Sequence, residues 1–338
     1  MRVLVLLGGR SAEHEVSLVS AGFVRRVLEG AGHETVPVMI GTDGQWTLNG
    51  EGLTFHVTSS PWRIFRGGEE IPFDVVFPVL HGPLGEDGTL QGLCRMADWP
   101  FTGAGVMTSS VAMNKITTKE LAVSGGIPVL PWKGFRKPVR PDDASLEELG
   151  FPLFVKPSRM GSSVGVSRVS DPQGLEAAVR EAYLYDDLII VEKGMEPARE
   201  IEVALLSENG TVSSSVPGEI VPGKEWYDYR AKYHCPGSRL LIPAPVPESL
   251  SVKVREMAEE SFRILGGEGF ARADFLLDSR GSCFFNEINT IPGFTEISMF
   301  PKLWKATGVQ PEELLERILS EALRRYRERG SNSVTVKI

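Results

Sequence analysis

Residues 3–30 read VLVLLGGRSAEHEVSLVSAGFVRRVLEG and contain the pattern that predicts the fold class. Val3–Leu7 is an unbroken apolar run of strand length, and two glycines end it. From Val16 to Leu28 apolar residues recur at the spacing of one helix face. Residues 35–40 and 73–80 are further strand-like runs. Strands that alternate with helices in this way predict an α/β domain, with a parallel sheet and helices on its faces.

The second half of the chain favours hairpins over alternating strands and helices. Helices are expected over residues 110–124, 252–265 and 311–325, and strands over 153–156, 165–169, 188–193, 199–206, 211–216, 270–277 and 282–288. Residues 221–247 are rich in Pro, Gly and Tyr and have weak periodicity. A long stretch without regular structure inside a compact domain is usually functional, so we expect a lid there.

Length and charge narrow the range of functions. With 338 residues the chain is long enough for two or three domains. Its formal net charge of -8 argues against a broad nucleic-acid-binding surface, and we expect no nucleic-acid partner. A local site for an anionic ligand is compatible with this charge, because loop amides and a few lysines can hold phosphate.

Cysteine usage and hydropathy indicate the compartment. Cys94, Cys235 and Cys283 stand alone, without a C-x-x-C pair. Buried or indifferent thiols are therefore favoured over a disulfide framework or a zinc site. No apolar stretch reaches the roughly 18 residues of a membrane-spanning helix, and the N-terminus lacks a signal-peptide pattern. We expect a cytoplasmic protein with no membrane partner.

The strongest local pattern lies in the predicted hairpin of residues 270–288. Arg272 and Asp274 are two apart on one strand, and Glu287 and Asn289 are two apart on the other, so each pair shares a strand face. With a turn at Asp278–Gly281, Arg272 lies opposite Glu287, and Asp274 is its diagonal neighbour at roughly 7 Å. Asp, Glu and Asn supply oxygen ligands, which suit Mg²⁺ and leave positions open for nucleotide phosphates. The alternative is a solvated polar face with one salt bridge.

The loop at residues 158–164, SRMGSSV, lies between two predicted strands. A turn of small residues with free amides can wrap phosphates, although neither of the two commonest phosphate-loop motifs is present. Lys156 precedes the loop, and a lysine there either extends toward solvent or faces an anion. A plain hairpin loop is the alternative.

Two loops follow strands of the first domain, GGRSAE at residues 8–13 and HGPLGEDG at residues 81–88. Ligands of open α/β sheets bind beyond the carboxyl ends of the strands, so both loops are expected at one edge. His81 is a candidate general base, with a structural hydrogen-bonding role as the alternative. Gly293 offers an unhindered amide that could stabilise an oxyanion, although ordinary turn chemistry explains its position equally well.

Together these stretches resemble the D-alanine–D-alanine ligase family, which has the ATP-grasp fold. The resemblance covers residues 2–325, and the motifs occur in the family's order. The stretches that carry it are residues 7–17 (LGGRSAEHEVS), 81–92 (HGPLGEDGTLQG), 156–165 (KPSRMGSSVG), 227–233 (YDYRAKY) and 286–295 (NEINTIPGFT). The resemblance implies an N-terminal parallel-sheet α/β domain and two C-terminal domains that clamp ATP. Their expected bounds are residues 1–107, 108–196 and 197–327, with a lid at about 221–247 and a tail at 328–338.

The resemblance also implies a role for each matching residue. The ATP set comprises Lys115, Lys156 and Ser163 at the phosphates, Glu192, Lys193 and Met195 at the adenine, Glu200 at the ribose, and Lys232 on the lid. Two Mg²⁺ or Mn²⁺ ions are implied on Asp274, Glu287 and Asn289, with Arg272 and the Gly293 amide as oxyanion stabilisers. Glu13, Ser162 and Tyr233 match a hydrogen-bonded triad that orients the lid. Glu13 and His81 would hold the first D-alanine, and Ser298 and Met299 would approach the carboxylate of the second.

The implied reaction makes D-alanyl-D-alanine for peptidoglycan synthesis in two steps, through an acyl phosphate, in an enzyme that is a homodimer. A related ligase for D-lactate or D-serine is one alternative, and Tyr233 favours the dipeptide over D-lactate. A non-catalytic ATP-binding regulator is a second alternative, and the complete metal and oxyanion set argues against it. Another ATP-grasp carboxylate–amine ligase is the third, which the Glu13 loop and the Tyr233 motif disfavour.

Overall fold

The N-terminal sheet follows from the buried runs of the first eighty residues. The computed structural model of the chain describes residues 1–141, 146–222 and 239–331. Strand β1 (Arg2–Gly8) pairs in parallel with β2 (Glu34–Ile40) and β7 (Val75–Pro78), and helix α1 (His14–Gly30) packs on β1. These elements confirm the predicted α/β pattern. The sheet continues past β2 as antiparallel strands that the sequence analysis did not predict: β3 (Trp46–Leu48), β4 (Glu51–His56), β5 (Arg63–Arg66) and β6 (Glu69–Glu70).

A second, antiparallel sheet has the strand order β10-β9-β11-β8. Its strands are β8 (Trp132–Arg136), β9 (Leu153–Pro157), β10 (Ser167–Val169) and β11 (Leu188–Lys193). Helix α6 (Leu175–Ala182) follows the 3-10 helix η1 (Pro172–Gly174) and buries its apolar face on this sheet, so the unit has its own core.

A third sheet contains the predicted hairpins. Its strands are β12 (Arg199–Glu208), β13 (Thr211–Ser214), β14 (Gly218–Val221), β15 (Arg239–Leu241), β16 (Phe270–Leu277) and β17 (Cys283–Asn289). Helices α3 (Val106–Met113), α4 (Lys115–Ser124) and α8 (Glu248–Ile264) share a core with one face of this sheet. Helices α9 (Met299–Ala306) and α10 (Pro311–Ser331) lie on the other face. Of the expected lid, residues 223–238 lie outside the described part of the chain.

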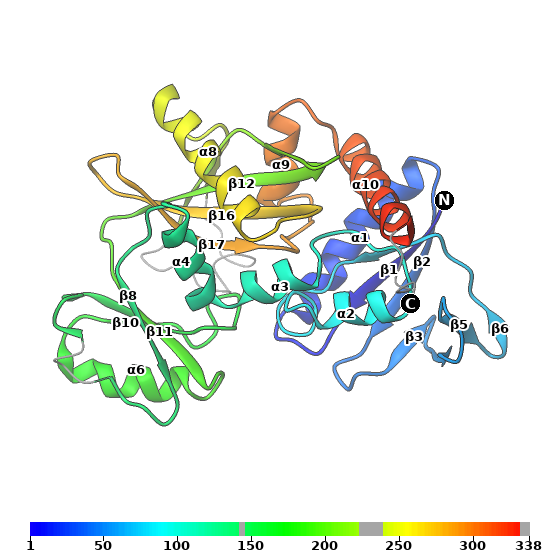
Figure 1. The fold of residues 1–338 in the computed structure, drawn as a ribbon, viewed down its shortest axis with the longest axis horizontal. Helices are drawn as coiled ribbons and strands as arrows, with labels where there is room; N and C mark the ends of the chain where they lie inside the picture. The colour runs from blue at the N-terminus through cyan, green and yellow to red at the C-terminus, as the bar shows by residue number, and fades with distance from the viewer. Residues whose placement is uncertain (142–145, 223–238, 332–338) are drawn as a thin grey trace, which may run out of the picture.

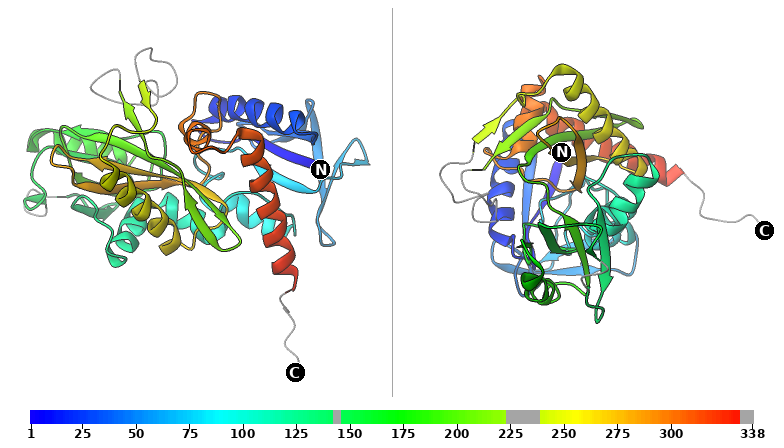
Figure 2. Two further views of the ribbon diagram at one scale, coloured as in Figure 1. Left: turned by 90° about the horizontal axis from the view of Figure 1, so that it is seen from above. Right: turned by 90° about the vertical axis from the view of Figure 1, so that its left-hand side faces the viewer.

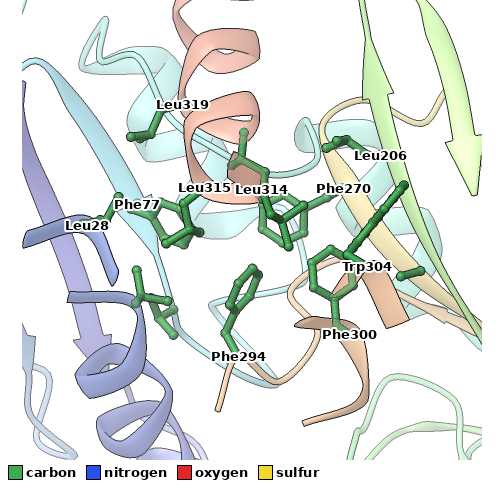
Figure 3. Packing of buried hydrophobic residues seen from close by; sticks show 14 of the residues in the cluster. Leu28, Phe77, Leu206, Phe270, Phe294, Phe300, Trp304, Leu314, Leu315 and Leu319 are labelled. Atoms are coloured by element: carbon green, nitrogen blue, oxygen red, sulfur yellow. The ribbon is translucent and has the colours of Figure 1, made fainter. Parts of the chain in front are cut away.

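The three sheets follow one another along the long axis of the molecule, with the third sheet between the other two (Figure 1). Helix α10 runs between the N-terminal sheet and the third sheet, as the view from above shows (Figure 2). Phe77, Phe270, Phe294 and Phe300 meet there in one aromatic cluster, with ring centroids 5.1–6.4 Å apart (Figure 3). The N-terminal sheet and the third sheet therefore share a single hydrophobic core.

The expected helix over residues 110–124 is wrong in one respect, because it is two helices. Asn114 has an extended backbone, and its side-chain oxygen accepts a hydrogen bond from the Thr117 amide at 3.3 Å. The Ser158 hydroxyl donates to the same oxygen at 2.9 Å. This cap ends α3, starts α4 and puts Lys115 at the first position of the new helix.

The predicted thiol environment is confirmed for the cysteines that the structure describes. Cys94 and Cys283 are free and buried, and burial raises the pKa of each thiol to about 12. Cys235 lies outside the described residues. Among the described helices, none combines the length and apolar character that crossing a membrane requires.

Candidate active site

The β16–β17 hairpin brings the predicted metal ligands together, although in a different register from the expected one. Asp274 lies opposite Glu287, and Arg272 lies opposite Asn289. The predicted pairing of Arg272 with Glu287 is wrong for two reasons: the turn is one residue longer, and a β-bulge after Asp274 adds another. Two one-residue shifts preserve the alternation of faces, so all four side chains still point to one side.

Arg272 lies between two carboxylates. It donates two hydrogen bonds of 2.7 Å to Asp274, and its Nε is 3.1 Å from Glu202 on the neighbouring strand β12. Burial opposes the charge of Arg272, but Asp274 and Glu202 outweigh this effect and raise its pKa well above the usual value. The sequence analysis missed Glu202. Its signal was the alternation of Glu200 and Glu202 directly before the apolar run of residues 203–206.

The residues of this hairpin fit a hard divalent cation. Asp274, Glu287 and Asn289 offer carboxylate and amide oxygens from adjacent strands, the donor type that Mg²⁺ and Mn²⁺ prefer. The Asn289 amide nitrogen donates to Asp274 at 3.0 Å, which shows that the two side chains touch. Within the described residues no cluster of three or more His, Cys, Asp and Glu side chains forms a metal site. The predicted set contains two carboxylates and one amide, so it does not require such a cluster.

A cleft of about 920 Å³ separates the second and third sheets above this hairpin. The predicted nucleotide residues within the described chain all line it: Lys115, Lys156, Ser163, Glu192, Lys193, Met195 and Glu200. Asp274 and Glu287 line the same cleft. A volume of this size is in the range of small-molecule sites and is enough for a nucleotide.

Lys115 connects the loop at 158–164 to the hairpin. Its ammonium group donates to the Met160 carbonyl at 2.8 Å and lies 3.3 Å from the Glu287 carboxylate. The backbone of Lys115 is fixed next to the α4 cap described above, because the Lys115 amide donates to the Ser158 carbonyl at 3.0 Å. The Lys115 ammonium group therefore contacts both the loop at 158–164 and the proposed metal ligand Glu287.

Glu192 lies between two lysines at the bottom of the cleft. It is hydrogen-bonded to Lys156, and its other oxygen is 2.7 Å from the ammonium group of Lys119 on α4. Burial opposes the charge of Glu192, but the two ammonium groups outweigh it and lower the pKa of Glu192 to about 2. Burial likewise opposes the charge of Lys156, and Glu192 reverses this and raises its pKa. The sequence analysis missed Lys119, since a lysine within a helix is usually solvated.

Three loops from distant parts of the sequence meet at Glu13. The Ser162 hydroxyl donates a hydrogen bond to the Glu13 carboxylate. A Cβ atom at Gly82 would lie 2.8 Å from the same carboxylate, and one at Gly161 would lie 3.2 Å from it. Glycine is therefore needed at Gly82 for this approach, and its φ of +77° adds a second reason. Ser162 and Ser163 also have positive φ values, 53° and 57°, an uncommon backbone conformation that clusters at functional sites.

His81 is buried behind this meeting point. Its Nδ1 lies 3.0 Å from the Ile291 carbonyl, and its Nε2 lies 3.2 Å from the Ser20 hydroxyl. Burial opposes protonation of His81, but the Glu86 carboxylate, 3.7 Å from Nδ1, outweighs it and raises the pKa of the imidazole. Both ring nitrogens have partners, as expected if His81 has a structural hydrogen-bonding role. Glu86 was not singled out from the sequence.

The remaining predicted residues lie in the turn after β17. Gly293 is partly exposed there, and the next residue, Phe294, is in the aromatic core. Ser298 is the N-cap residue of α9, and its hydroxyl accepts from the Thr295 amide at 3.0 Å. The Met299 side chain is buried in the core, so only its backbone can face a ligand at this helix N-terminus. Lys232 and Tyr233 lie outside the described residues.

Comparisons with known proteins match the chain to one family. Two family models match the chain, "D-ala D-ala ligase N-terminus" over residues 2–104 and "D-ala D-ala ligase C-terminus" over residues 121–320. A D-alanine–D-alanine ligase from Heliobacterium modesticaldum is 43% identical over 358 residues, covering 98% of this chain and 97% of that protein. The D-alanine–D-alanine ligase structure from Coxiella burnetii has a TM-score of 0.86 and 32% identity, covering 98% and 97% of the two chains. VanG D-Ala:D-Ser ligase from Enterococcus faecalis has a TM-score of 0.84 and 29% identity, covering 95% and 99%.

Proposed function

The chain belongs to the D-alanine–D-alanine ligase family, and we propose that it joins two D-alanine molecules into D-alanyl-D-alanine, coupled to the cleavage of ATP to ADP and phosphate. The fold is the ATP-grasp fold of that family. One observation carries the proposal. The β16–β17 hairpin presents Arg272, Asp274, Glu287 and Asn289 on one face, beside the cleft that Lys115 and Lys156 line.

ATP is proposed to lie in the 920 Å³ cleft with its phosphates toward the hairpin. Lys115, Lys156 and Ser163 would contact the phosphates, because they surround the cleft at the loop of residues 158–164. Glu192, Lys193 and Met195 would border the adenine, and Glu200 would hold the ribose. An ionised Glu192 can accept a hydrogen bond from the adenine amino group, which supports its position.

Asp274, Glu287 and Asn289 would hold the divalent ions, which we propose are two Mg²⁺ or Mn²⁺. The bound ions would neutralise the charge of the phosphates. Arg272 is already held rigid by Asp274 and Glu202, so its guanidinium is available as a fixed positive group for an oxyanion. The Gly293 amide would be the second donor.

The substrates are proposed to lie between Glu13 and helix α9. Glu13 would bind the ammonium group of the first D-alanine. Ser162 would orient the Glu13 carboxylate through its hydrogen bond, and His81 would lie behind Glu13. The first carboxylate takes the terminal phosphoryl group of ATP, and the amine of the second D-alanine displaces phosphate from the acyl phosphate. Amides at the start of α9, near Ser298 and Met299, suit the second carboxylate. Lys232 and Tyr233 would belong to a lid that keeps water from the acyl phosphate.

D-Serine or D-lactate as the second substrate is less favoured than D-alanine. The 43% identical relative is named a D-alanine–D-alanine ligase, whereas the D-Ala:D-Ser ligase VanG is 29% identical. Similar TM-scores mean that the fold alone does not distinguish these substrates. The same family supports a role in peptidoglycan precursor synthesis, and we further propose a cytoplasmic homodimer.

A phosphate-release assay tests the function directly. Purified protein with Mg-ATP and D-alanine should release phosphate in step with D-alanyl-D-alanine, and L-alanine and D-lactate should release little. Glu287→Gln should lose nearly all turnover because it removes a carboxylate ligand, while the matched change Glu256→Gln on the exposed face of α8 should keep it. Normal turnover in Glu287→Gln would defeat the metal assignment. Phosphate release with another acid alone would indicate a different ATP-grasp ligase.

A further inference from the structure

Lys119 is a buried lysine that none of the roles proposed above uses. Its side chain is 2% exposed, on the inner face of α4. Fully buried lysines are rare unless they are paired. Among the described residues its one ion-pair partner is Glu192, at 2.7 Å. Such a group either holds α4 to β11 or acts on the cleft through Glu192.

The charges of this group do not cancel. Lys119 and Lys156 contribute two positive charges, and Glu192 contributes one negative charge between them. The Lys156 side chain is 16% exposed and lines the cleft, whereas Lys119 does not reach it. The net positive charge of these three groups therefore faces the cleft at the position proposed for the ATP phosphates, beside the carboxylates of Glu200 and Glu287, which are proposed to bind the ribose and the metal ions.

Without Lys119 the balance would change. Glu192 and Lys156 would form a neutral pair, and a phosphate oxygen would compete with Glu192 for the Lys156 ammonium. In a buried site such competition is strong, because charges interact more strongly at low effective dielectric than in water. With Lys119 in place, its ammonium group pairs with one oxygen of Glu192 on the side away from the cleft. Glu192 then attracts the Lys156 ammonium less strongly, which leaves it available to a phosphate oxygen.

We propose that Lys119 is a positioning residue for ATP, which neutralises Glu192 and so leaves the charge of Lys156 for the phosphates. The inference rests on the proposed function, because it needs a nucleotide in this cleft. The proposed role of Lys119 differs from a merely structural role in one measurable way. A charge-balancing role weakens ATP binding more than adenosine binding, whereas a loosened α4 weakens both.

The test compares dissociation constants for ATP and adenosine, measured by calorimetry without D-alanine, in four proteins. They are the unaltered chain, Lys119→Met, the double variant Lys119→Met with Glu192→Gln, and the control Lys133→Met. Lys133 is a partly exposed lysine on strand β8 of the second sheet, and it pairs with Glu148. The measured quantity is the affinity for ATP divided by that for adenosine, so effects of Glu192→Gln on the adenine cancel.

Lys119→Met should lower this ratio by about tenfold or more, and Lys133→Met should leave it unchanged. The double variant restores the net charge of one and should return the ratio to within about threefold of the unaltered value. An unchanged ratio in Lys119→Met overturns the proposal, as does a double variant that shows no recovery.

Thermal unfolding of each variant shows whether it is folded. If Lys119→Met does not fold, Lys119→Gln takes its place, because its amide can still donate a hydrogen bond to Glu192 without carrying a charge. A ratio about tenfold lower then supports the proposal, and an unchanged ratio overturns it. If the unaltered chain does not bind ATP, the proposed function itself fails. If it binds ATP and Lys119→Met binds equally well, only this inference fails.

Discussion

Arg272 shows how neighbouring side chains can fix the orientation of a charged group beside this cleft. A guanidinium between two carboxylates keeps one orientation, and Glu202 contributes an ion pair at 3.1 Å from a strand that carries no proposed metal ligand. If Asp274 binds a cation, Glu202 is the contact that stays with Arg272. Glu202 therefore holds Arg272 in place, and its effect should appear in the rate of the reaction.

Glu202→Gln should lower kcat by roughly 10–100-fold, because it removes a buried carboxylate that pairs with the Arg272 guanidinium at 3.1 Å. The KM for ATP should change little, since Arg272 is proposed to act on the reacting carboxylate. Steady-state kinetics with Mg-ATP and D-alanine measures both. The matched control is Glu219→Gln, which removes a similar pair with Arg199 on the same sheet. Equal losses in the two variants would contradict a specific role for Glu202.

The residue types of the site were predictable from the sequence, but several of their partners were not. Asp274, Glu287 and Asn289 could be assigned to one face because strands alternate with a period of two. Lys119, Glu86 and Glu202 were missed, because a charged residue in a helix, loop or strand is usually solvated. Only the folded chain shows that each is buried against an opposite charge.

At the scale of elements, buried runs were predicted best. Residues 188–193 and 270–277 are strands with the expected bounds, since apolar residues predominate in each and acidic or glycine residues flank it. Strands β3 to β6 were missed because they are short and half exposed, which leaves little hydrophobic pattern. The bulge after Asp274 and the break at Asn114 depend on contacts with other elements, so local sequence did not indicate them.

The break between α3 and α4 has a consequence for the cleft, because Asn114 caps α4 and binds the loop at Ser158. Asn114→Ala should lower the free energy of unfolding by about 1–2 kcal/mol, the usual loss for a helix cap. It should also weaken ATP binding, since Lys115 starts at this cap. Urea unfolding and calorimetry measure the two effects.

The control for this change is Asp171→Ala, which removes an exposed cap at η1, away from the cleft. It should reduce stability without changing ATP affinity. An Asn114→Ala protein that is destabilised but binds ATP normally would separate the cap from the nucleotide site and contradict the prediction.

At the scale of the whole molecule, the cores indicate which parts move together. The N-terminal sheet and the third sheet share the core around Phe77 and Phe270, whereas the second sheet has its own core around Val155 and Val191. The expected division at residues 107 and 196 stays a prediction. These cores suggest where to test it, because units with separate cores can open separately.

Native-state hydrogen exchange should therefore show two levels of protection. Amides of β9 and β11 should exchange through a partial opening of lower free energy than amides of β1 and β16, which need the shared core to unfold. A non-hydrolysable ATP analogue with Mg²⁺ should slow exchange in β9 and β11 most, because it would bridge the second and third sheets across the cleft. Peptides of β1 serve as the internal control. Equal opening free energies in β1 and β9 would mean that the chain unfolds as one unit, and closure by an independently moving second sheet would then be excluded.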